Sequence, residues 1–269
     1  MATSSGTLSI RNTTMDYIRF GSGEKTLVML PGLGDGLRTV KGTALPMSLI
    51  YRKLATKFTV YAFSRINDLP EGYSTLDMAK DQGEVMRALG IQKANVLGVS
   101  MGGMVAQHLA AEEPALIDKL VLAVTSAEPH HAINESVNEW ISLARRGDHA
   151  AFMDSNLKRM YTEQYYRRNK WILPLSALLT KPKSYERFFA QASACLAHNS
   201  IRDLCRIECP TLVIGGEKDR ALDPEQSRKM AELIPHCSLI MYPDYGHALY
   251  EEASGFESTV LDFLIGGRG

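Results

Sequence analysis

Eight short apolar runs, rich in β-branched residues, alternate along this chain with longer segments of helical period. Parallel strands need long crossover connections, usually helices, so this alternation predicts βαβ units and an α/β fold with a mainly parallel sheet flanked by helices. A chain of 269 residues is long enough to bury the core of such a fold. The expected strands, of which the first two form an antiparallel pair, cover 8–12, 15–20, 26–30, 58–63, 94–99, 119–124, 211–216 and 238–243.

Helices are expected to begin near Pro46, Ser74, Ser100 and Asp223. The helix near Asp223 is predicted from the sequence Asp-Pro-Glu-Gln at 223–226. It has a residue of N-cap type, proline at the first helical position and glutamine three residues after the cap, as in a capping box. This interpretation gives Asp223 a structural role at the start of a helix.

The alternation is interrupted once, between the apolar runs 119–124 and 211–216. A connection of that length without secondary structure is uncommon. We therefore expect an inserted helical cap subdomain over 128–203, with the core domain formed by 1–127 and 204–269. The aromatic residues of the insertion either form its own core or line a pocket beneath it.

Charge, hydropathy and cysteine content argue against several classes of protein. The chain has 30 basic and 30 acidic residues, so no overall field attracts it to nucleic acid or to an anionic membrane. Its first twenty residues lack the apolar stretch of a signal peptide, and no run approaches the roughly 20 apolar residues of a membrane span. We expect a cytoplasmic protein without nucleic-acid or membrane partners, and the oligomeric state stays open. Cys205 and Cys209 have a spacing that suits a metal, but no companion cluster accompanies them, so reduced thiols and no bound metal are expected.

One serine stands among glycines in the sequence GVSMG at 98–102, where the run 94–99 ends and a helical segment begins. G-x-S-x-G between a strand and a helix is the pattern of a nucleophile elbow, a tight turn that raises the serine hydroxyl above the sheet. Residues two positions away on either side come into near-contact in such a turn, which favours glycine at Gly98 and Gly102. We predict that Ser100 is a catalytic nucleophile.

A serine hydroxyl is a weak nucleophile unless a base accepts its proton and an acidic residue orients that base. In a fold with this elbow the acid and then the histidine follow the serine, each on a loop after a strand. Of seven histidines, only His247 follows the final expected strand. The loop after the preceding strand offers Glu217, Asp219 and Asp223. Glu217 lies too close to the strand end and Asp223 caps a helix, so we predict Asp219 as the acid. Asp244 is the alternative, although its position three residues before the histidine suits a turn residue.

Acyl transfer also needs N–H donors for the oxyanion. The backbone N–H of Met101 lies at the expected start of a helix, where the helix dipole favours negative charge. A second donor is expected from the glycine-rich loop 30–36, and we predict the N–H of Leu33. A simple Gly/Pro turn explains this loop almost as well when the loop is considered alone.

Four stretches together resemble the α/β-hydrolase superfamily, and the resemblance extends over nearly the whole chain. They are PGLGDG at 31–36, GVSMGG at 98–103, GGEKD at 215–219 and YGH at 245–247. The sequence from the elbow onward is most similar to the branch of small carboxylesterases, enol-lactonases and C–C hydrolases. The resemblance implies a mainly parallel eight-stranded sheet with a helical cap inserted after the sixth strand.

The resemblance also implies residue roles. Relatives with aspartate at the elbow are dehalogenases or epoxide hydrolases, so the serine here argues against both activities. Many relatives carry His-Gly in the oxyanion loop, where this chain has Pro31-Gly32; the backbone donor survives this difference, whereas substrate contacts differ. The implied roles are Ser100 as nucleophile, His247 as base, Asp219 as acid, and Leu33 with Met101 as the oxyanion hole.

The sequence therefore predicts a serine hydrolase without a cofactor that acts on a small-molecule carboxylic ester, with lactones and thioesters as further possibilities. C–C bond hydrolysis, perhydrolysis and acyl transfer use the same three residues. A ligand-binding protein with little turnover is a different class that also retains them, and turnover on a panel of esters distinguishes it. The basic doublets at 145–146 and 167–168 lie on solvated helix faces or contact an acidic substrate.

Overall fold

The computed structural model describes residues 3–266, apart from the side chains at positions 173, 176, 178 and 179. In this part of the chain, eight strands form one sheet in the order β1-β2-β4-β3-β5-β6-β7-β8. β2 pairs antiparallel with β1 and with β4, and the other neighbouring strands are parallel. This confirms the predicted mainly parallel sheet. The strands are β1 (Thr3–Ile10), β2 (Thr13–Gly21), β3 (Lys25–Leu30), β4 (Phe58–Ile66), β5 (Ala94–Val99), β6 (Ile117–Ala123), β7 (Thr211–Gly216) and β8 (Cys237–Tyr242).

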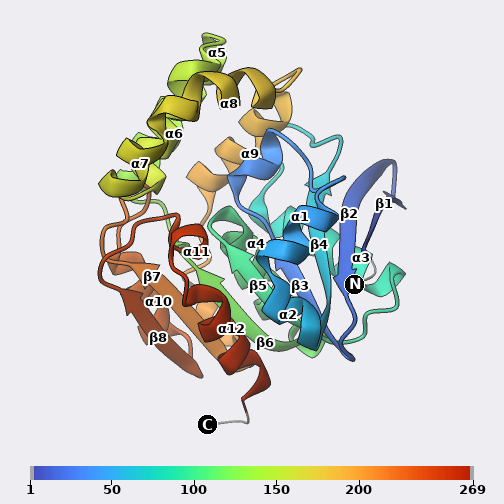
Figure 1. Ribbon diagram of the computed structural model, residues 1–269. Coiled ribbons are helices and arrows are strands. Elements are labelled where there is room, and N and C mark those ends of the chain that lie inside the picture. The colour runs from blue at the N-terminus through green and yellow to red at the C-terminus, as the bar shows by residue number, and fades with distance from the viewer. Residues whose placement is uncertain (1–2, 267–269) are drawn as a thin grey trace.

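Helices cover both faces of the sheet, and each face has its own apolar core (Figure 1). Every residue of β5 is buried, as is typical of a central parallel strand. Successive side chains of a strand point to opposite faces, so Val96 packs in one core and Leu97 in the other. One face is covered by α1 (Ala44–Ile50), α2 (Arg52–Lys57) and α12 (Phe256–Ile265), and the other by α3 (Thr75–Ala88), α4 (Met101–Glu112) and α10 (Glu225–Leu233).

Five helices lie between β6 and β7 in the sequence, and we call them the cap helices. Figure 1 shows α5 to α8 gathered at the end of the molecule opposite the C-terminus. The strand-free stretch is therefore helical, while its division from the core as a subdomain over 128–203 stays a prediction. The cap helices are α5 (His131–Arg145), α6 (His149–Met160), α7 (Glu163–Asn169), α8 (Leu173–Thr180) and α9 (Glu186–Ala197).

The first strand lies earlier than predicted. The sequence prediction covered 8–12, but β1 ends at Ile10, which pairs with Thr13 of β2. Arg11 and Asn12 form the turn between them, and Arg11 adopts a positive φ of 48°. The pairing of the whole strand with β2 thus determines its position, and the local apolar pattern does not.

The predicted capping box at Asp223 is wrong in detail. α10 begins at Glu225 with Pro224 as its N-cap, and no side chain caps it. Asp223 nevertheless accepts a hydrogen bond from the backbone N–H of Glu225 at 3.0 Å, so its structural role is retained. A complete capping box occurs instead at the start of α3, where Ser74 and Asp77 exchange side-chain-to-backbone hydrogen bonds.

All four cysteines are unpaired thiols: Cys195 is buried, Cys205 is exposed, and Cys209 and Cys237 are partly buried. Over residues 3–266, no group of three or more His, Cys, Asp or Glu side chains is arranged to hold a metal ion. None of the helices described has both the length and the apolar character needed to cross a bilayer.

Candidate active site

Ser100 occupies a strained turn between the end of β5 and the start of α4. Its backbone has φ 53° and ψ −123°, a region that costs a non-glycine residue about 1–3 kcal/mol. The turn is held by its N–H, which donates to the Ala123 carbonyl at 2.9 Å. A Cβ at Gly98 would lie 2.6 Å from the Gly102 oxygen, and one at Gly102 would lie 1.9 Å from the Leu30 oxygen. Both glycines are therefore required by close backbone approach.

His247 links Ser100 to Asp219. It follows β8 and precedes α11 (Leu249–Glu252). Its Nε2 lies 2.9 Å from the Ser100 Oγ, and its Nδ1 lies 2.8 Å from the Asp219 Oδ2. A carboxylate only accepts, so Nδ1 carries the ring proton and Nε2 is left to accept from the serine hydroxyl. The second oxygen of Asp219 accepts from the backbone N–H groups of Ala221 and Leu222, both at 2.8 Å.

The other acidic candidates are paired away from the histidine. Glu217 accepts from the Arg228 guanidinium at 2.5 Å. Asp244, with 79% of its side chain exposed, pairs with the Lys218 ammonium at 2.9 Å. By contrast, the side chains of Asp219 and the histidine are each only 4% exposed. The structure thus brings together Ser100, Asp219 and the histidine, and it directs the alternatives elsewhere.

The predicted oxyanion loop lies beside the serine. Its 3-10 turn η1 (Leu33–Gly36) follows Gly32, and a Cβ built there would lie 3.3 Å from the Ser100 Cβ. Leu33 lines the same cavity as Ser100. Met101 is the first residue of α4, so its N–H has no acceptor within the helix. Both residues lie where the sequence placed them, and their roles as donors stay predictions.

A buried charged cluster, which the sequence did not reveal, holds this loop. The Asp35 side chain is fully buried, and its Oδ2 accepts from the Arg65 N–H at 3.0 Å, the Arg187 Nη2 at 2.5 Å and the Gln191 Nε2 at 3.1 Å. Arg65, also fully buried, donates from Nη2 to the Pro31 carbonyl at 2.7 Å. Arg187 and Gln191 belong to α9. The cluster therefore ties both ends of the loop to β4 and to a cap helix.

The same contact between loop and cap involves Gly36, because a Cβ there would lie 2.8 Å from the Phe188 Cα of α9. Burial lowers the pKa of the Arg65 guanidinium, and the neighbouring carboxylate of Asp35 counteracts this effect. These residues lie in three separate parts of the sequence. The only local signal of the cluster is an aspartate within the glycine-rich loop.

Ser100 lines a small cavity of about 30 Å³. Trp140 contributes to its wall, is 6% exposed, and has an indole N–H without a hydrogen-bond partner in the part of the chain described. Burial raises the pKa of the Cys195 thiol in the same wall to about 12. The cavity is lined by Leu33, Ser100, Met104, Ile133, Val137, Trp140, Cys195, Ala221, Leu222 and His247.

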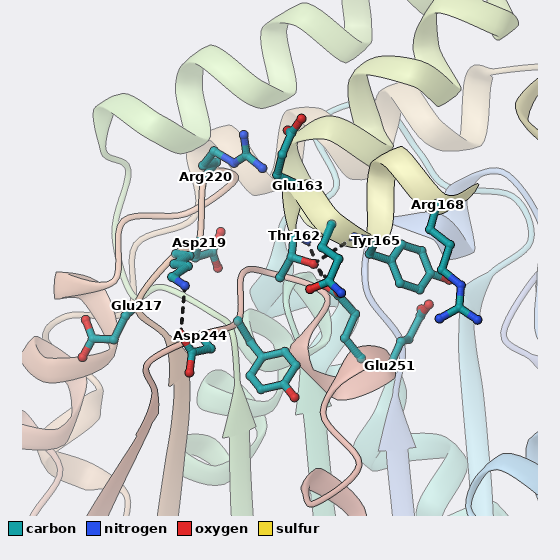
Figure 2. A pocket seen from close by; sticks show the side chains of 13 residues that line it. Thr162, Glu163, Tyr165, Arg168, Glu217, Asp219, Arg220, Asp244 and Glu251 are labelled. Carbon is teal, nitrogen blue, oxygen red and sulfur yellow. Dashed lines mark hydrogen bonds and ion pairs between the residues drawn. The ribbon is translucent and has the colours of Figure 1, made fainter. Parts of the chain in front are cut away.

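A larger pocket of about 900 Å³ is lined by Asp219 and its neighbours Glu217, Lys218 and Arg220. Figure 2 shows Thr162 and Tyr165 at the start of α7 on one side of it, with Glu217 and Asp244 from the loops after β7 and β8 on another. Neither the nucleophile nor the histidine lines this pocket. Ser100 and His247 line the smaller cavity, and of the three predicted residues only Asp219 lines the larger pocket.

The sequence matches the family model of the alpha/beta hydrolase fold over residues 25–254. It is 26% identical to the serine hydrolase BPHL of Mus musculus over an alignment of 287 positions, which covers 98% of this chain and 87% of that protein. It is 28% identical over 208 residues to RutD of Pseudomonas savastanoi pv. phaseolicola, which is named as a carbamate hydrolase; the alignment covers 73% of this chain and 77% of RutD.

Solved structures agree with this assignment. The enol-lactonase from Burkholderia xenovorans LB400 superimposes with a TM-score of 0.81 at 25% identity, covering 96% of this chain and 99% of that one. MGS-M2, an alpha/beta hydrolase enzyme from a Medee basin deep-sea metagenome library, has a TM-score of 0.83 at 21% identity, with 96% and 97% of the two chains covered. The family model spans most of the sequence, and the sheet has the corresponding topology, so this chain belongs to the α/β-hydrolase family.

Proposed function

We propose that this protein is a serine hydrolase that cleaves carboxylic esters through an acyl-enzyme on Ser100. The proposal rests above all on the relay from the Ser100 Oγ through His247 to Asp219, with distances of 2.9 and 2.8 Å. Ser100 lies in a strained turn, and backbone strain of this kind persists mainly at functional sites. Membership of a hydrolase family supports the reaction class.

In the first half of the reaction, the Ser100 Oγ attacks the ester carbonyl carbon while the Nε2 of His247 accepts its proton. Asp219 holds the Nδ1–H and stabilises the imidazolium that forms. The carbonyl oxygen becomes an oxyanion and accepts from the N–H groups of Leu33 and Met101. Each such donor contributes about 3–4 kcal/mol of transition-state stabilisation.

In the second half, the imidazolium of His247 gives its proton to the departing alkoxide, and the C–O bond to the alcohol breaks. A water molecule then attacks the acyl carbon as Nε2 accepts its proton. The bond to the Ser100 Oγ breaks, the oxygen takes back a proton from the imidazolium, and the carboxylic acid leaves. Every proton in this sequence moves on the protein's own residues, so the proposed reaction requires no cofactor.

The walls of the cavity indicate the substrate class. They are mainly apolar, so the acyl or alcohol part of the small-molecule substrate is apolar. The indole N–H of Trp140 is the one buried side-chain N–H without a partner among the described wall residues, and it suits an ester oxygen. A space of about 30 Å³ is too small for an ester, so substrate entry requires wall residues to move, and several of these residues belong to the cap helices α5 and α9. Lactones and carbamates present a similar acyl carbon and belong in the same substrate panel.

A fluorophosphonate probe tests the proposal directly. We expect the wild-type protein to be labelled once, with the modified peptide containing Ser100, and Ser100→Ala to remain unlabelled. Ser238→Ala, which changes an exposed serine on β8, is the matched control and should label like the wild type. His247→Gln should slow labelling by about a thousandfold, because the nucleophile loses its base.

Steady-state turnover separates an enzyme from a binding protein of the same fold. The panel consists of short and long p-nitrophenyl esters, a lactone, a carbamate and a thioester. Turnover that disappears in Ser100→Ala supports the hydrolase. A folded wild-type protein that neither labels at Ser100 nor turns over any member of the panel would refute the proposal, and single labelling without turnover would favour the binding protein.

A further inference from the structure

The segment 164–185 of the cap carries an unusual charge distribution. It contains no aspartate or glutamate, although the chain as a whole has equal numbers of acidic and basic residues. Its basic residues are divided between the two ends of α8, and all of them are exposed. They are Arg167, Arg168 and Lys170 before the helix, and Lys181 and Lys183 after it.

Between these cations the cap exposes apolar side chains. Trp171 is 76% exposed, Leu175 59% and Ile172 38%. Trp171 belongs to the 3-10 turn η3 (Lys170–Ile172) that leads into α8, and Leu175 belongs to the first turn of that helix. Ala177, by contrast, is 7% exposed, and α8 packs against α6. Figure 1 shows α8 in the layer of the molecule that lies away from the sheet.

Most of the cations have no carboxylate partner. Arg167 pairs with Glu163 one turn earlier, at 2.7 Å. Within the described residues, no carboxylate lies within 4.0 Å of Arg168, Lys170, Lys181 or Lys183. Asp154 interacts electrostatically with Lys170, and Arg168 lines the larger pocket together with Glu251 and Glu252, so the cations farthest from acidic neighbours are Lys181 and Lys183. A face that exposes tryptophan and leucine beside such cations complements a surface that is both anionic and apolar.

We propose that this face of the cap, defined by Arg167–Lys170, Trp171, Ile172, Leu175, Lys181 and Lys183, docks on an anionic lipid bilayer. The cations pair with lipid phosphates and carboxylates, and Trp171 with Leu175 inserts at the level of the headgroups. The balanced net charge predicts no membrane partner, but the local charge determines binding at short range, because salt screens charges beyond about 10 Å. Docking of this kind is peripheral and needs no spanning helix.

A second exposed apolar face, on α1, provides the comparison. Leu45 and Leu49 are 62% and 67% exposed there, which is similar to the residues of the cap face. Of the neighbouring cations, the Lys41 ammonium lies 3.7 Å from a carboxylate oxygen of Asp16. Lys53 donates to the Ser258 hydroxyl at 2.6 Å, which leaves its charge in place, and among the described residues no carboxylate lies within 4.0 Å of Arg52. Both faces therefore combine exposed apolar side chains with unpaired cations, and the cap face differs in its exposed Trp171. Tryptophan is enriched at the headgroup level of membranes, so the proposal predicts binding by the cap.

Vesicle co-sedimentation of the full chain tests the proposal. Ser100→Ala protein is used, so that binding is measured without hydrolysis and does not depend on the proposed function. We expect partition onto phosphatidylcholine vesicles with about 30% phosphatidylserine, weak partition onto phosphatidylcholine alone, and loss of binding between about 0.02 M and about 0.3 M salt. No partition onto the anionic vesicles at low salt would overturn the proposal.

Tryptophan fluorescence locates the contact, because the chain has two tryptophans. Trp140 is 6% exposed and Trp171 is 76% exposed, so Trp140→Phe leaves the emission of the exposed indole alone. That emission should shift to the blue when anionic vesicles are added. An unchanged spectrum in the presence of sedimenting vesicle-bound protein would place the contact elsewhere and overturn the proposal.

Paired surface variants complete the test. Lys181→Gln/Lys183→Gln should weaken partition about 25-fold, at about fivefold for each charge removed. Trp171→Ser/Leu175→Ser should weaken it at least tenfold, and Leu45→Ser/Leu49→Ser should leave it within about twofold. Binding that survives in the cap variants but is lost in the α1 variant refutes the proposal. The proposal is also refuted if the protein binds no vesicles and instead forms a concentration-dependent dimer that Trp171→Ser/Leu175→Ser dissociates. In that case a second copy of the chain covers the face.

Discussion

Replacing Asp35 by asparagine tests whether the buried cluster positions the oxyanion loop. The carboxylate is the shared acceptor of three N–H donors and the counter-charge of two arginines, Arg65 and Arg187. An amide keeps the shape but removes the charge, and its NH₂ group adds two N–H donors where the surrounding groups are already donors. The variant therefore leaves one fully buried and one largely buried guanidinium without an anion.

The expected cost follows from the burial of the cluster. Removing one partner of a buried ion pair costs about 3–5 kcal/mol, and the remaining amide oxygen places Asp35→Asn near the lower end, at about 3 kcal/mol. Typical domains have about 5–15 kcal/mol of unfolding free energy, so the protein should still fold. Loss of a whole oxyanion donor lowers kcat about 100- to 1000-fold; a displaced loop should lower it about 10- to 100-fold, with a smaller change in KM.

Urea unfolding followed by circular dichroism gives the free energy of unfolding, and hydrolysis of a p-nitrophenyl ester gives kcat and KM. Asp118→Asn is the matched control, because Asp118 forms a partly exposed pair with Lys93 and its loss should cost less than about 1 kcal/mol. In a double-mutant cycle, Arg187→Met should cost much less in the Asp35→Asn background than in the wild type. A cost below about 1 kcal/mol for Asp35→Asn, or strictly additive costs in the cycle, would refute a coupled cluster.

Three further predictions concern the loop, a buried histidine and a cavity thiol. Gly36→Ala should destabilise the protein by about 1–3 kcal/mol, because its Cβ would lie 2.8 Å from the backbone of α9; Gly34→Ala, which meets nothing within 4 Å, should leave the thermal midpoint nearly unchanged. Burial lowers the pKa of His198 to about 3. Below about pH 6.5, His198 therefore binds a proton in the unfolded chain but not in the folded protein. This difference lowers the free energy of unfolding by about 2 kcal/mol at about pH 5. His198→Gln should remove this loss in urea titrations at about pH 7.5 and about pH 5, and equal losses in both proteins would contradict it. Cys195, with a pKa of about 12, should react with iodoacetamide at least about a thousandfold more slowly than exposed Cys205, and similar rates by mass spectrometry would show that the cavity is open.

The parts that were predictable from the sequence carry local patterns. The turn at Ser100 is recognisable in the sequence because close backbone approach excludes side chains at Gly98 and Gly102. The central strands are buried on both faces and read as continuous apolar runs. β1 is mostly exposed and polar, so only its pairing with β2 defines its bounds. The prediction at 8–12 was accordingly wrong.

The parts that were not predictable depend on contacts between distant residues. Asp35 meets Arg187 and Gln191 across 152 and 156 positions of sequence, and such a pairing leaves no periodic pattern. The two tryptophans of the cap differ for the same reason. Both lie in helical segments, yet Trp140 lines the cavity beside Ser100 and Trp171 is exposed, because helix packing decides which face is covered.

The cap helices contact the loops on both sides of the nucleophile. α9 holds the predicted oxyanion loop through Asp35. At the end of α6, the Met160 carbonyl accepts from the N–H of Ala248, the neighbour of His247, at 2.8 Å. Thr162, before α7, donates from its backbone N–H and its hydroxyl to Glu252 at 3.0 and 2.7 Å. In the proposed reaction, a shift of the cap that admits a substrate would therefore move the surroundings of the proposed oxyanion donors and of His247. Substitutions that reshape the cap for another substrate should for this reason change kcat as well as KM, even where they lie far from the serine.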